Sequence, residues 1–218
     1  MNLGTIRTLA ASFAQDPNIT RYTSARYNQA INLANQQFAM DTRALWKDSS
    51  STVVDGTATY SLPSDFMWED WVTLANLPLI PISRYRIQEV SKTNDWTLDK
   101  GTPTHYIIDP EEAQKKIRLY PIPQSDDASK TVVMRYFPLP ATLSSDTDTP
   151  MNSSALMSQF HMGLAAFAAW TLLLSEQSTP QIVEKRNELL KVYTDAVNKA
   201  TETFRNTVSA PLRLRPIK

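Results

Sequence analysis

The chain has 218 residues, of which 42% are hydrophobic and 20% are charged, and its formal net charge is zero. This length suffices for one large domain or two small ones, and the neutral balance excludes a whole-molecule field that would draw the chain onto nucleic acid or a membrane. Cysteine is absent, which excludes disulfides, thiolate catalysis and cysteine-containing zinc sites. The first residues lack the pattern of a signal peptide and the apolar stretch 162–174 is too short to span a bilayer, so we expect no membrane segment.

Two amphipathic helices are predicted at the N-terminal end. Apolar residues recur at helical spacing from Leu3 to Phe13, which indicates a helix over residues 2–15. The Asp-Pro-Asn sequence at residues 16–18 ends this helix. A second helix is predicted over residues 23–45, with Thr23 or Ser24 as its N-cap.

From residue 48 to residue 150 the pattern changes to short strands. Proline, β-branched and aromatic residues are concentrated there, and strands are predicted at residues 57–62, 71–75, 104–108, 116–120 and 130–137. Ser83 is expected to cap a short helix, and the sequence DDAS at residues 126–129 is typical of a hairpin turn. The segment is therefore predicted to form a mostly antiparallel, β-rich module.

Helical periodicity returns after Pro150. A largely apolar, buried helix is predicted over residues 155–175, capped by Ser153 or Ser154, and another over residues 180–206, where Thr179 and Pro180 give a start signal. The predicted fold class is α+β. An antiparallel α-helical bundle, made of residues 1–47 and 151–208, is interrupted by the β-rich module of residues 48–150. Residues 209–218 are predicted to form an extended tail, because their two prolines exclude a long helix.

Residues able to carry catalysis or bind a metal are few. His105 and His161 are isolated from any ligand pattern, so we expect both to be structural or solvated. Acidic pairs at residues 69–70, 111–112 and 126–127 lie in predicted loops or turns, where water solvates both carboxylates. Only 4 glycines are present, and no phosphate-binding motif occurs. We therefore predict a protein that is not an enzyme and has no cofactor and no metal.

Two tryptophans flank Glu69 and Asp70. Trp71 is expected to fill the core of the β-rich module, whereas Trp68 is a possible interface aromatic, because tryptophan often anchors protein–protein contacts.

The tail alternates apolar and cationic side chains, in the order Leu212, Arg213, Leu214, Arg215 and Ile217. A period of two is typical of a strand that is added to a sheet or groove of a partner. The alternative is a frayed terminus. We predict that the tail docks on a partner protein or on a neighbouring copy.

Several short motifs follow one another in a recognisable order. They are LPSDF at residues 62–66, GTPTHY at 101–106 and IRLYPIP at 117–123, followed by a predicted helical hairpin after Pro150. This order resembles that of the head-to-tail adaptor (connector) proteins of tailed bacteriophages. It is also similar to the tail tubular protein A class, in which a β-rich module interrupts a helical bundle.

The resemblance implies a structural virion protein, made in the host cytoplasm, that acts at the head–tail junction. It implies a ring of twelve copies between the portal protein and a distal tail or nozzle protein. DNA would pass through the lumen of this ring without sequence-specific binding, and the tail of residues 209–218 would meet the portal or a neighbouring copy.

Two other classes of protein stay open on the sequence alone. A tail accessory protein with a receptor- or glycan-binding β module would expose aromatic side chains and form no ring. A nucleic-acid-binding protein would show salt-sensitive affinity for DNA, because phosphate contacts release counterions.

Overall fold

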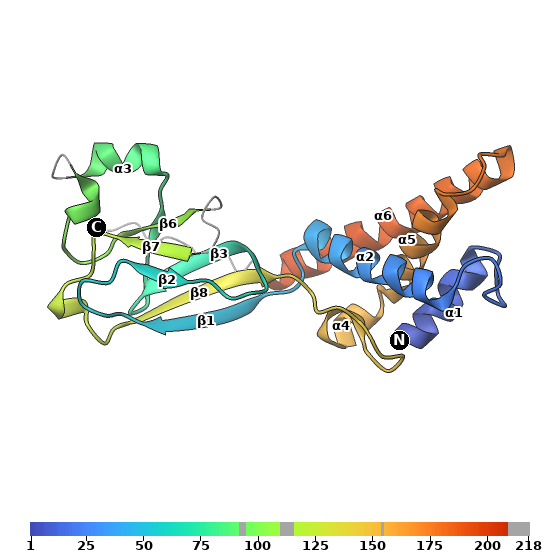
Figure 1. Cartoon of the computed structure of the whole chain (residues 1–218), viewed down its shortest axis with the longest axis horizontal. Coiled ribbons are helices and arrows are strands. Elements are labelled where there is room, and N and C mark those ends of the chain that lie inside the picture. Colours follow the sequence, from blue (N-terminus) through green and yellow to red (C-terminus); the bar gives the residue numbers. More distant parts are fainter. Residues whose placement is uncertain (92–94, 110–115, 154, 209–218) are drawn as a thin grey trace. The chain divides into compact units, whose positions relative to one another are not determined.

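The structure is a computed structural model that describes residues 1–91, 95–109, 116–153 and 155–208. The chain divides into two compact units, one made of Met1–Leu45 with Leu139–Lys218 and the other of Trp46–Pro138. The first unit is helical, and the second contains two β-sheets and a short helix (Figure 1). The predicted α+β class is confirmed.

Among its described residues, the helical unit contains five α-helical segments: α1 (Leu3–Phe13), α2 (Ser24–Thr42), α4 (Ala155–Ser158), α5 (His161–Leu173) and α6 (Pro180–Val208). Polar side chains cap α1 and α2, and the cap of α2 is the predicted Thr23. The side chain of Asn2 accepts a hydrogen bond from the backbone N–H of Thr5, and that of Thr23 accepts one from the N–H of Arg26. The start of α6 at Pro180 and its long amphipathic face are confirmed.

Helix α5 lies at the centre of this unit. It is apolar on nearly all sides, and it packs against α1, α2 and α6. Gly163 permits a close approach of α5 to α6, because a Cβ atom added there would lie only 2.5 Å from the Cβ of Ala196. The aromatic side chains of Phe38, Tyr193 and Phe167 meet in the same core, with the rings of Phe167 and Tyr193 separated by 4.6 Å.

The single helix predicted over residues 155–175 is wrong, because the chain breaks between α4 and α5. The break brings Phe160 into the core, where its ring lies 6.1 Å from that of Phe38. Ser154, one of the two predicted caps, lies outside the described residues.

Residues 139–150 belong to the helical unit, whereas their sequence pattern predicts that they are part of the β-rich module. The side chain of Asn32 on α2 hydrogen-bonds both the N–H and the carbonyl of Leu143, at 2.7 and 3.0 Å. Arg7 on α1 forms an ion pair with Asp146 at 2.8 Å. These long-range contacts hold the segment on the helices, and no local pattern in the sequence reports them.

The second unit consists of two four-stranded sheets. One has the order β1 (Lys47–Thr52), β8 (Thr131–Pro138), β3 (Phe66–Leu74) and β4 (Leu77–Pro78); the other has the order β2 (Thr59–Ser61), β7 (Lys116–Tyr120), β6 (His105–Asp109) and β5 (Ile80–Pro81). Neighbouring strands are antiparallel, except that β5 runs parallel to β6. Both sheets contribute to one apolar core, which contains Val72, Met134 and Leu119.

Two features of this unit differ from expectation. Strand β1 was not predicted, because its sequence KDSSST has no apolar alternation; it is held by pairing along its whole length with β8. The predicted hairpin turn at residues 126–129 is wrong, since β7 and β8 belong to different sheets. Asp127 in this connection is fully buried and pairs with Lys130 at 2.7 Å, so the prediction that water solvates it is also wrong.

Helix α3 (Arg84–Val90) packs beside the second sheet (Figure 1). Ser83 caps it as predicted, accepting a hydrogen bond from the backbone N–H of Arg86. Ile87 anchors the helix in a small core with Ile107 and Tyr120.

Candidate interaction site

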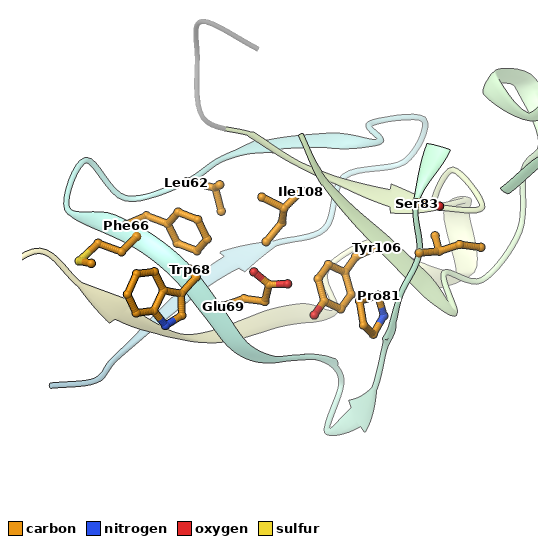
Figure 2. Close-up of a pocket in the computed structure, with 10 residues that line it drawn as sticks. Leu62, Phe66, Trp68, Glu69, Pro81, Ser83, Tyr106 and Ile108 are labelled. Carbon is orange, nitrogen blue, oxygen red and sulfur yellow. The ribbon is translucent and has the colours of Figure 1, made fainter. Parts of the chain in front are cut away.

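A pocket of about 560 Å³ lies in the second unit, where β3 of one sheet meets β6 and the segment between β5 and α3 of the other (Figure 2). Its lining is mostly apolar and comes from three stretches of chain. The residues are Leu62, Phe66, Met67, Trp68, Glu69, Pro81, Ile82, Ser83, Tyr106 and Ile108.

Strand β3 contributes four consecutive residues, 66–69, to this lining. In a regular strand successive side chains point to opposite faces, so only two of the four would face one pocket. The pairing of β3 with β8 shifts register between Phe66 and Trp68 and again between Glu69 and Trp71. Such bulges bend a strand and re-aim its side chains. Phe66 pairs with Pro138 and Glu69 with Tyr136, and both partners lie on the buried side of β8, so the bulge places Glu69 on the same face as Phe66.

The walls of the pocket are well packed. Phe66 and Tyr106 are 5% and 3% exposed, and the ring of Phe66 packs on that of Tyr136. Trp68 is partly buried, and its ring lies 6.1 Å from that of Phe137 on the neighbouring strand. The aromatic side chains are therefore held in place by their packing within the sheet.

Two polar groups lie within these apolar walls. Figure 2 shows the carboxylate of Glu69 in the middle of the pocket, between Trp68 and Tyr106. Within the described parts of the chain, Glu69 makes no hydrogen bond or ion pair. Burial, together with the negative charges of Glu69 and Asp70, raises the pKa of the Tyr106 hydroxyl to about 12. The pocket thus combines apolar walls with a negative field, which favours a ligand that is both apolar and cationic.

A second aromatic group surrounds Arg135 on β8. Its guanidinium lies 4.2 Å from the ring centre of Trp46 and 5.0 Å from that of Trp71, and it pairs with Asp48 at 2.9 Å. Trp71 was expected in the core of the β-rich module. It lies instead opposite Arg135 and outside the buried core cluster, because the neighbouring Val72 occupies the inward position. The charge of Arg135 is therefore matched by Asp48 and by two aromatic rings, whereas Glu69 has no such partner among the described residues.

The other predicted residues are five residues of the tail and the two histidines. Leu212, Arg213, Leu214, Arg215 and Ile217 fall outside the described residues. His105 contacts the hydroxyl of Thr104 at 2.8 Å. His161 is buried in the helical unit, where burial and the N-terminal ammonium group lower its pKa to about 4, and its Nδ1 lies 2.9 Å from the nitrogen of Met1.

Within the ranges that the structure describes, no three acidic, histidine or cysteine side chains gather as a metal site. No helix in those ranges combines the length and the apolar character needed to cross a membrane.

Sequence reasoning selected Trp68 but missed the importance of Glu69 and Tyr106. Glu69 was read as one of a pair of solvated loop acids, and this is wrong, because it lies within β3 and lines the pocket. The only local signal was its position between two tryptophans, which is unusual for a turn. Tyr106 gave no signal beyond that of a strand residue.

Among known proteins, the chain matches a protein family and no individual curated protein. The family model described as SU10 adaptor protein matches residues 1–215, which is nearly the full length and includes both structural units. The chain therefore belongs to the SU10 adaptor protein family of bacteriophage adaptors.

Proposed function

We propose that the protein is a non-enzymatic component of the virion that forms a ring of twelve copies at the head–tail junction. In this role it connects the portal protein to a distal tail or nozzle protein, and DNA passes through the lumen of the ring during genome ejection. The observation that carries the proposal is the family match over residues 1–215. The likeness of its motif order to the tail tubular protein A class is part of the same proposal.

The two units supply different surfaces for assembly. A closed ring requires a heterologous interface, in which one face of each copy meets a different face of the next. We assign one face to an antiparallel bundle formed by the helices of residues 1–47 and 151–208, and the other to the β-rich module. Trp68 is the proposed interface aromatic of that module. The tail residues Leu212, Arg213, Leu214, Arg215 and Ile217 are the proposed docking residues, on the portal or a neighbouring copy.

The charge of the chain fits a channel through which DNA moves. Its 22 basic and 22 acidic residues cancel. Tight binding of DNA depends on cations that neutralise phosphates and release counterions, and a neutral protein supplies no such excess. A neutral lumen lets the duplex slide without sequence-specific contact.

The test is assembly of the purified protein with its portal. Electron microscopy of the mixture should show twelvefold rings stacked on the portal, and antibody labelling of virions should mark the head–tail junction. A protein that stays a single copy in the presence of the portal would contradict the proposal. If that single copy bound a glycan array, the receptor-binding alternative would replace it; salt-sensitive retention on DNA would favour a nucleic-acid-binding protein.

A further inference from the structure

We propose that the pocket between the two sheets receives the C-terminal tail, residues 209–218, of a neighbouring copy of the same chain. The proposal rests on the proposed ring and adds to it the site at which one copy engages the next. It assigns Glu69 as the acidic partner of a tail arginine, and Phe66, Trp68 and Ile108 as apolar contacts.

The tail and the pocket are complementary in charge. The tail has three cations, at Arg213, Arg215 and Lys218, and no acidic residue. Glu69 is a carboxylate without a partner among the described residues, set in apolar walls beside a tyrosine that is also under the field of Asp70. Taking a carboxylate partly out of water is unfavourable unless a cation or hydrogen-bond donors replace the water. A guanidinium supplies both, because it can donate two parallel hydrogen bonds to one carboxylate.

The tail and the pocket are also complementary in apolar character. In an extended chain Leu212 and Leu214 point to one side and Arg213 and Arg215 to the other. The pocket presents its apolar walls on several sides of a single central carboxylate, so it can contact both sides of such a chain. Its volume of about 560 Å³ is that of a site for a few side chains, so only part of the ten-residue tail enters it.

A neighbouring copy fits the proposed ring better than other occupants. A heterologous interface joins two different features of one chain, and the tail and the pocket are two such features. DNA is disfavoured, because the carboxylates of Glu69 and Asp70 repel phosphate. A tail that enters the pocket of its own chain would add nothing to contacts between copies, and the experiment below separates that case.

The absence of cysteine from the chain allows a direct test with full-length protein. One preparation carries Met67→Cys in the pocket lining, and a second, of different mass through an added tag, carries Leu214→Cys in the tail. After mixing and mild oxidation during assembly, we expect a disulfide-linked heterodimer on a denaturing gel. The control pairs Leu214→Cys with Thr52→Cys, an exposed position on β1 of the same unit, and should give little product.

Charge exchange tests the ion pair itself. Glu69→Arg should lower the yield of heterodimer at least about tenfold, because it replaces a charge-assisted contact with repulsion. Arg213→Glu with Arg215→Glu in the partner preparation should restore it. Asp55→Arg, an exposed acid of the same unit that is not part of the pocket lining, is the matched control and should change little.

The outcomes separate this proposal from the ring. Rings on the portal with no heterodimer above the Thr52→Cys control would leave the adaptor role intact and overturn the tail–pocket contact. A chain carrying both Met67→Cys and Leu214→Cys that forms only an internal disulfide would also overturn it. So would a photo-crosslinker attached to Leu214→Cys that labels only the portal. A heterodimer that survives Glu69→Arg unchanged would show that the acidic group does not hold the tail.

Discussion

The connection between α1 and α2 is organised by one buried carboxylate, and removing its charge should destabilise the helical unit. Asp16 is 4% exposed and accepts hydrogen bonds from the backbone N–H groups of Thr20, Arg21 and Tyr22, at 2.8 to 3.1 Å. It also accepts from the hydroxyls of Thr20 and Tyr27. The loop that enters α2 is therefore folded around this one side chain.

The substitution Asp16→Asn keeps the shape but turns one acceptor into a donor. If Oδ1 is retained, the new amide group faces the N–H of Tyr22, which then has no acceptor in a buried position. An unsatisfied buried N–H costs about 1–3 kcal/mol. The remaining bonds change from an ionised to a neutral acceptor and lose about half their strength. We expect unfolding to become easier by about 2–4 kcal/mol at neutral pH.

The effect should depend on pH in a defined direction. Burial alone raises the pKa of the Asp16 carboxyl, but the hydrogen bonds from Arg21, Thr20 and Tyr22 outweigh it, so the pKa lies well below its usual range. An unfolded aspartate titrates near pKa 3.9, roughly, so the stabilisation is complete above that value and is lost as the pH falls toward the folded pKa. The difference between wild type and variant should be constant from about pH 5 to pH 7 and shrink below about pH 4.

Urea denaturation of the full chain at several pH values measures this difference. The exposed Asp195→Asn on α6 is the matched control, and it should change the free energy of unfolding by less than about 0.5 kcal/mol. A loss below about 1 kcal/mol for Asp16→Asn at pH 7, or a loss that does not shrink in acid, would refute the reasoning.

Two further substitutions test the packing of each unit. Gly163→Ala should lower the free energy of unfolding by about 1–2 kcal/mol in urea denaturation, because overpacking against Ala196 exceeds the gain in helix propensity. Gly4→Ala is the control. Its Cβ would meet Asp146 at an ordinary 3.4 Å, so it should be neutral or stabilising. Burial and the hydrogen bond to Asp65 raise the pKa of Tyr136 to about 12, so the stability that this pair contributes is present below pH 10 or so and is lost toward pH 12. In an ultraviolet titration, Tyr136→Phe should remove the absorbance change of one tyrosine that ionises near pH 12. An unchanged absorbance curve at alkaline pH would contradict this.

The helices were predictable because their signals are local. Thr23, Ser83 and the pair Thr179-Pro180 mark helix starts within a few residues of chain, and the structure has helices at each of them. The interruption before α5 was not predictable, because no glycine or proline marks it in residues 155–161. Apolar periodicity cannot distinguish one buried helix from two when every face is apolar.

The strands were predictable one by one, but their arrangement was not. Alternation in residues 116–120 and 131–138 reports that one face of each strand is buried, and both strands occur there. It does not report which core they share or which strand is the neighbour. The turn after β7 has the composition of a hairpin, yet the chain crosses there to the other sheet. β1 shows the opposite case, in which pairing with β8 makes a strand from a sequence with little strand propensity.

The pocket could not be predicted, because it depends on the register between neighbouring strands and on the packing of the two sheets. Glu69 faces inward because two bulges shift β3 against β8. Tyr106 lies near it because the two sheets pack together around one shared core. In the sequence, Glu69 is one of two adjacent acids, and this pattern predicts a carboxylate that is solvated by water. In the folded chain it is a carboxylate among aromatic side chains, where losing water is costly unless a cation replaces it. The unmatched charge of Glu69 in this apolar site is the feature on which we base the proposal that the pocket binds a cationic segment of a neighbouring copy.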